Sequence, residues 1–129
     1  MGNRDQSGGA CNDRRSDFSE RNPTLHHGTL NAIFMPAVIE FNRSAPTSAS
    51  ENKYRHIAQA MGLNSGDEIE SAVKAMTKAI GLPTSLSEIG VTRDLFERIV
   101  TGALADHSHK TNPRDATSAD YITMLEASF

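Results

Sequence analysis

The stretch LHHGTLNAIFMPAVIEFN, residues 25–42, is the most informative part of the chain. Its apolar residues recur at the spacing of one helix face, and they are Ile33, Phe34, Ala37, Val38 and Phe41. We therefore expect a helix over residues 28–41. Pro36 lies inside this helix and cannot donate a backbone hydrogen bond to the carbonyl of Ala32, so we also expect a kink.

Similar patterns predict four further helical segments and a short helical turn. They span residues 51–61, 65–80, 85–89 (the turn), 93–104 and 118–127. Ser65 and Glu68 have the spacing of a capping box, as do Thr117 and Asp120, and Thr92 is a candidate cap. No segment alternates with a period of two residues. The sequence therefore predicts an all-α fold, a bundle of about five helices.

The third predicted helix, residues 65–80, has a regular apolar face. Ile69, Val73, Met76 and Ile80 follow helical spacing, and we expect all four to face inward. Glycines follow three of the helical segments and should end them, because glycine adopts the left-handed conformation without strain. These glycines are Gly62, Gly81 and Gly90.

The composition limits the class of protein. The chain has 129 residues, which suits one domain, and its net charge of -3 provides no basic stripe, so we expect no nucleic-acid partner. Cys11 is the single cysteine, which excludes an internal disulfide. The longest apolar run, residues 32–39, is too short for a membrane span, and the N-terminus is polar. We expect a cytoplasmic protein with no membrane partner.

Residues 1–24 differ from the rest of the chain. After Met1 they contain one large apolar residue, Phe18, among Gly, Ser, Asn and charged residues. Such a segment cannot bury enough apolar surface to offset the entropy of ordering it, so we expect a disordered tail. Residues 25–129 then form the helical domain.

Two histidines and a glycine stand at the start of the first predicted helix. His27 lies where the helix dipole disfavours a positive charge, so a neutral ring there could bind a metal, with Gly28 allowing close backbone approach. The same residues are also typical of a polar helix start with two surface histidines. The local pattern fits both interpretations.

The segment closely resembles the signature of the iron-containing (group III) alcohol dehydrogenases, roughly HGxxNAxxLPxVxxFN. The residues in register are His27, Gly28, Asn31, Ala32, Pro36, Phe41 and Asn42, with Met35 where leucine is usual. Three later stretches also resemble the family in the same order. They are KYRHIAQAMGL (53–63), AIGLPTSLSEIGV (79–91) and ALADHSHKTNPR (103–114). The resemblance covers about residues 23–129 and implies the family's C-terminal helical domain.

In this family the histidine of the His-Gly pair is one of four ligands to a catalytic divalent metal, usually iron and sometimes zinc. His27 occupies that position, and His26 is its neighbour. The family's other ligands, an aspartate and two histidines, precede the signature, where this chain has no histidine. Asp13 and Asp17 fall near the expected spacing, but the residues around them do not resemble the family, and we assign them no role.

The resemblance also implies an NAD(P) cofactor held by an N-terminal α/β domain with a glycine-rich phosphate loop. Ser7, Gly8 and Gly9 have no predicted strand before them and no predicted helix after them, so they do not fit such a loop. We therefore expect a truncated dehydrogenase with one metal ligand, no catalytic or cofactor-binding residue, and no activity alone.

Two other functions fit the same residues. The chain could be the C-terminal subunit of a split dehydrogenase whose cofactor domain is a separate chain. It could also be a non-enzymatic helical module that binds another protein, or a second copy of itself, through an exposed apolar face.

A second histidine cluster, Asp106-His107-Ser108-His109, has the residue types of a metal site. It lies in a predicted loop, and the family resemblance places it outside the metal ligands. We therefore expect a solvated loop in which residues 112–114, Asn-Pro-Arg, form a turn. We expect His56 to be a surface or interface residue.

Overall fold

The computed structural model describes residues 26–45 and 48–129. The predicted disorder of residues 1–24 concerns residues outside this part. The helices are α2 (His27–Arg43), α3 (Ser48–Ala60), α4 (Ile69–Ala79), α5 (Phe96–Ala105) and α6 (Ser118–Ala127). Short 3-10 helices are η1 (Gly66–Glu68), η2 (Ser87–Ile89), η3 (Arg93–Leu95) and η4 (His107–Thr111). The described residues contain no strand, so the predicted all-α fold is confirmed.

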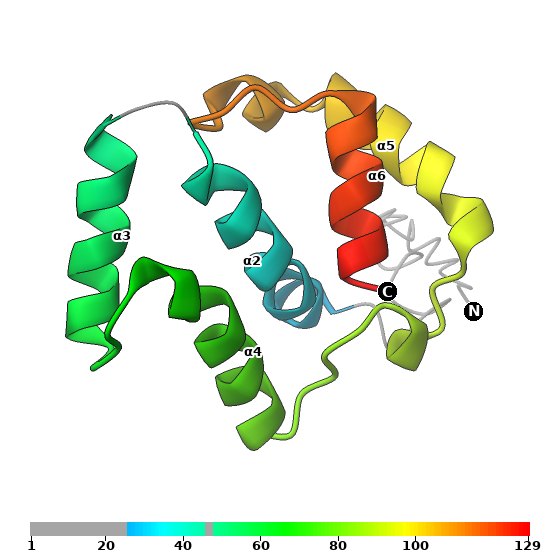
Figure 1. Ribbon diagram of the computed structural model, residues 1–129. Helices are drawn as coiled ribbons and strands as arrows, with labels where there is room; N and C mark the ends of the chain where they lie inside the picture. The colour runs from blue at the N-terminus through cyan, green and yellow to red at the C-terminus, as the bar shows by residue number, and fades with distance from the viewer. Residues whose placement is uncertain (1–25, 46–47) are drawn as a thin grey trace, which may run out of the picture.

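Helix α2 occupies the centre of the fold. It packs against α3, α4 and α6, and α5 packs in turn against α6. In Figure 1, α3 and α4 lie on one side of α2, and α6 and α5 lie on the other. The helix continues through Pro36, which is buried, and ends two residues later than predicted, at Arg43 rather than Phe41. One helix therefore joins both halves of the molecule.

Two apolar clusters hold these halves together. The larger cluster consists of Ile33, Leu86, Ile89, Val91, Phe96, Val100 and Leu125. The smaller one consists of Ala58, Ile69 and Val73, with Ile39 of α2 packed against it. Because α2 contributes to both clusters, a shift of this helix would disturb both cores.

Local sequence signals account for most helix ends. At η1, the Ser65 hydroxyl accepts from the backbone N–H of Asp67 (3.2 Å), and Glu68 Oε1 accepts from the N–H of Ser65 (3.0 Å). This confirms the predicted capping box, although the helix begins with a 3-10 turn and α4 ends one residue before Ile80. Gly81 has a φ of 77°, a left-handed conformation that favours glycine and ends the helix.

Two local predictions were wrong. The Thr92 side chain makes no capping hydrogen bond, and its backbone carbonyl instead accepts from Leu95 N–H (3.1 Å) in the 3-10 turn η3. Met76 of α4 and Ile80, which directly follows α4, face solvent, with 55% and 67% of their surface exposed. The buried face of α4 instead follows strict i, i+4 spacing because its packing partners lie on one narrow side. Its buried residues are Ile69, Val73 and Thr77.

A hydrogen-bonded clamp fixes the C-terminal end of α2. Asn42 Nδ2 donates to Asn112 Oδ1 (3.1 Å), and Asn112 Nδ2 donates to Asn42 Oδ1 (2.7 Å) and to the carbonyl of Arg114 (2.6 Å). Arg114 Nη1 donates to the carbonyl of Phe41 (3.2 Å) and to Ser44 Oγ (2.6 Å). The Arg114 guanidinium also lies 4.0 Å from the centre of the Phe41 ring. We call this group of five residues the α2 clamp.

The clamp corrects the prediction that residues 112–114 form a turn in a solvated loop. Asn112 and Arg114 are half-buried, and the preceding residues form η4. Residues separated by 70 positions in the sequence are thus joined by a reciprocal amide pair.

We expect Asn112→Leu to lower the free energy of unfolding by about 2 kcal/mol, because it removes three half-buried hydrogen bonds and leaves the Asn42 amide without its partner. Urea unfolding followed by circular dichroism would measure the change. Asn64→Leu, at an exposed position, should stay within about 0.5 kcal/mol of the wild type. Equal midpoints for the two variants would contradict a stabilising role for the clamp.

Candidate metal-ligand site and the hollow beside η4

His26 and His27 have different structural roles at the start of α2. His26 has extended backbone (ψ 133°), and its Nδ1 accepts from the backbone N–H of Gly28 at 3.2 Å, so it is the N-cap of the helix. His27 is the first residue of the helix, and its ring is exposed. Its Nε2 lies 3.0 Å from Nδ2 of Asn31, one turn further along. His26 therefore caps the helix, whereas the His27 ring makes no capping contact.

Among the described residues, His27 could supply one imidazole ligand to a divalent metal, but no complete metal site is formed. Within residues 26–45 and 48–129, no group of three or more His, Cys, Asp or Glu side chains could hold a metal ion. A catalytic metal normally has at least three protein ligands. The remaining candidates considered in the sequence, Cys11, Asp13, Asp17 and residues 7–9, lie outside the described residues.

The cluster at Asp106 does not bring its two histidines together. Asp106 Oδ1 accepts from the backbone N–H of Ser108 at 2.7 Å, which caps η4 and lowers the pKa of Asp106. His107 is 95% exposed, with its Nδ1 3.6 Å from Asp106 Oδ1. His109 is half-buried, and its Nδ1 lies 2.9 Å from the Tyr121 hydroxyl. The cluster is therefore a helix cap and an aromatic contact, and among the described residues it provides no metal site.

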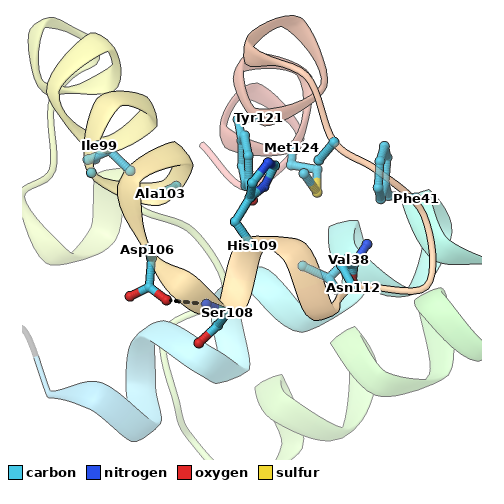
Figure 2. A pocket seen from close by; sticks show the side chains of 12 residues that line it. Val38, Phe41, Ile99, Ala103, Asp106, Ser108, His109, Asn112, Tyr121 and Met124 are labelled. Atoms are coloured by element: carbon cyan, nitrogen blue, oxygen red, sulfur yellow. Dashed lines mark hydrogen bonds between the residues drawn. The ribbon is translucent and has the colours of Figure 1, made fainter.

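His109 and Tyr121 line a hollow of about 540 Å³ beside η4 (Figure 2). Its apolar wall contains Val38, Phe41, Ile99, Ala103 and Met124. Burial raises the pKa of Tyr121, and the negative charge of Asp106 raises it further. Among the polar groups at the hollow, His109 Nδ1 bonds to the Tyr121 hydroxyl, and Asn112 belongs to the clamp. The hollow is therefore mainly an apolar surface depression.

Sequence reasoning missed Asn31 and Tyr121 as partners of the two histidines. Asn31 could have been found, because a residue four positions after His27 lies on the same helix face. Tyr121 could not, because the contact with His109 depends on how α6 packs beside η4.

No helix in the described part of the chain is both long enough and apolar enough to cross a membrane.

Comparison with known proteins identifies relatives for most of the chain. Residues 22–129 match the Fe-containing alcohol dehydrogenase family, C-terminal. The chain is 53% identical over 104 residues to 4-hydroxybutyrate dehydrogenase of Cupriavidus necator, covering 81% of this chain and 27% of that protein. It is 31% identical over 110 residues to NAD-dependent methanol dehydrogenase of Bacillus methanolicus, covering 79% of this chain and 28% of that protein.

A solved structure shares the fold. The crystal structure of a 1,3-propanediol oxidoreductase superposes with a TM-score of 0.74 at 24% sequence identity, covering 88% of this chain and 31% of that chain. The matched region agrees with the predicted family resemblance over residues 23–129. The chain thus spans less than a third of the length of the relatives it matches.

The different roles of His26 and His27 can be tested by measuring the free energy of unfolding of their variants. His26→Ala should lower the free energy of unfolding by about 0.5–1 kcal/mol through loss of the N-cap, and His26→Asp should restore it because aspartate is a strong N-cap. His27→Ala should change stability by no more than about 0.5 kcal/mol, since it loses one exposed contact. Thermal unfolding would measure all three variants. Equal losses in the two alanine variants would rule out the capping role of His26.

Proposed function

This chain belongs to the Fe-containing alcohol dehydrogenase family, and from that membership we propose that it is the metal-side helical domain of an NAD(P)-dependent alcohol dehydrogenase. In this role it contributes His27 as one ligand of a divalent metal, iron or zinc. The observation that carries the proposal is the exposed ring of His27 on the first residue of a long helix whose residues are in register with the family signature.

The chemistry explains why one ligand is insufficient. Oxidation of an alcohol to a carbonyl requires removal of a hydroxyl proton and transfer of a hydride from carbon to a nicotinamide ring. A divalent metal, when bound, polarises the alcohol oxygen as a Lewis acid. The described residues would hold and orient one imidazole for that metal, while the other ligands and the cofactor site would come from residues outside them. We therefore propose that the chain has no dehydrogenase activity alone.

The relatives suggest the first substrate to test. The protein at 53% identity is a 4-hydroxybutyrate dehydrogenase, and the one from Bacillus methanolicus is NAD-dependent by name. We propose 4-hydroxybutyrate as the alcohol and NAD as the hydride acceptor for a completed enzyme.

A second candidate is suggested by exposed apolar side chains on α2, on α4 and directly after α4, since these two helices pack against each other. Met35, Met76 and Ile80 are 47%, 55% and 67% exposed. Exposed apolar patches are typical of a contact with another domain or chain. These side chains support a split enzyme with a separate cofactor-domain chain, or a non-enzymatic module that binds a protein or a second copy of itself.

Reconstitution tests these proposals. The chain would be mixed with the part of the Cupriavidus necator relative that it does not match, together with Fe²⁺ or Zn²⁺, and NADH formation from 4-hydroxybutyrate would be followed. We expect activity in the mixture only, and a loss of at least about 100-fold with His27→Ala, because loss of a direct ligand should exceed the effect of losing an outer-shell partner. His56→Ala, at an exposed position on α3, is the matched control.

The chain alone provides the complementary measurement. Purified protein should retain less than one metal ion per chain after dialysis, and NAD should not change its melting temperature. One-to-one metal retention that survives His27→Ala would overturn the assignment of His27. A stable protein complex without dehydrogenase activity, whose affinity is unchanged by chelator and by His27→Ala, would favour the binding module.

A further inference from the structure

Helix α2 has the composition of a helix that is buried on every side. Leu30 and Ile33 pack into the larger cluster, and Ile39 packs against the smaller one. Met35 and Val38 are equally apolar, yet they are 47% and 38% exposed. A helix that is apolar all round is normally covered all round. Within the described part of the chain, one side of this central helix therefore has no cover.

The uncovered side of α2 consists of His27, Asn31, Met35 and Val38. Their helical spacing places these residues on one face, and all of them are exposed. Residues 27–39 contain no Asp, Glu, Lys or Arg. The centres of protein interfaces are depleted of charged residues in the same way. This side of α2 therefore has the composition of an interface rather than of a solvated helix face.

The uncovered side of α2 leads into the hollow beside η4. Val38 belongs to both, and it lines the hollow together with Phe41 and Met124 (Figure 2). Gly102 of α5 also lines the hollow, and a Cβ added to it would meet no other part of the chain within 4 Å. The hollow thus has space for an apolar side chain of a partner, which would remove its wall from water.

The exposed apolar residues of α3 and α4 have a different setting. Ile57 of α3 and Met76 of α4 are 44% and 55% exposed. Lys53 lies one turn before Ile57, and Lys74 lies two residues before Met76, both with exposed side chains. Single apolar residues beside charged ones are ordinary on protein surfaces. The uncharged side of α2 is therefore the better candidate for an interface.

We propose that the uncovered side of α2 and the hollow beside η4 form the docking surface for the N-terminal part of a dehydrogenase of this family. The inference rests on the proposed function. The family match is to the C-terminal region and begins at residue 22, and the chain covers 27% of the 4-hydroxybutyrate dehydrogenase. In that relative the remaining polypeptide leads into the segment equivalent to α2, whose first residue, His27, begins the uncovered side. The partner presents an uncharged apolar surface to α2 and places one apolar side chain in the hollow.

Val38→Lys and Gly102→Leu test this surface in two different ways. The full chain would be titrated with the part of the Cupriavidus necator relative that it does not match, and the dissociation constant measured by interferometry. Val38→Lys places a charge in the interface and Gly102→Leu fills the hollow, so each should weaken binding by at least about tenfold. Gly102→Leu should not lower the melting temperature, because leucine favours a helix more than glycine does. Its loss of binding would therefore not reflect unfolding.

Ile57→Lys and Thr101→Leu are the matched controls. They make the same kinds of change at exposed positions outside the proposed surface, on α3 and on α5 beside Gly102. Both should leave the dissociation constant within about twofold of the wild type, as expected for residues outside an interface. Equal weakening by Ile57→Lys and Val38→Lys would overturn the proposal, as would full binding by Gly102→Leu.

A joined protein gives a second measurement that does not depend on two separate parts finding each other. The unmatched part of the relative would be joined directly before residue 22, with Cys11→Ser in every variant. Met35→Cys should be alkylated at least about tenfold more slowly in the joined protein than in the chain alone, because a covered thiol reacts only when the contact opens. Ile57→Cys, the control, should react equally fast in both, and peptide mass spectrometry would read each rate.

Neither measurement requires metal, NAD or activity, so the docking surface and the proposed function can fail separately. Protection of position 35 in a joined protein without dehydrogenase activity would uphold the docking surface and overturn the proposed function. Activity in the joined protein with position 35 as reactive as in the chain alone would overturn the docking surface only.

Discussion

The attachment of α2 at its C-terminal end is the constraint on which the rest of the structure depends. The amide pair of Asn42 and Asn112 and the contacts of Arg114 with Phe41 join this helix to the segment between α5 and α6. Reciprocal amide bonds satisfy donors and acceptors on both partners at once, so a shifted register would leave several half-buried groups unpaired. The clamp therefore selects one position of α2, and both apolar clusters form around that position.

The sequence correctly predicted the structural features that depend only on residues close together in the chain. Capping boxes at Ser65 and Thr117, and the glycine stop at Gly81, depend on side chains and backbone within a few positions, and the structure confirms them. The apolar spacing of residues 28–41 likewise predicted the central helix. These signals act in a short peptide as they do in the folded chain, which is why they can be read without a structure.

What the sequence did not predict depends on packing between distant segments. Nothing in the spacing of Ile69, Val73, Met76 and Ile80 indicates that the last two face solvent, because the width of the buried stripe is set by α2 and α3. The same holds for Asn112, whose partner lies 70 positions earlier, and for His109, whose partner belongs to α6. The candidate ligand His27 came from family resemblance, and its contact with Asn31 was within reach of helical spacing.

The arrangement of α2 also suits the role proposed for its first residue. A helix of 17 residues is about 25 Å long, so His27 lies far from the clamp along a stiff element. Leu30, Ile33 and Phe34 pack into the larger cluster within two turns of the histidine, which limits movement of the exposed end. A metal whose ligands come from separate segments requires each segment to hold its ring in place independently. In helix α2 the clamp fixes the C-terminal end, and the larger cluster holds the half of the helix that carries His27.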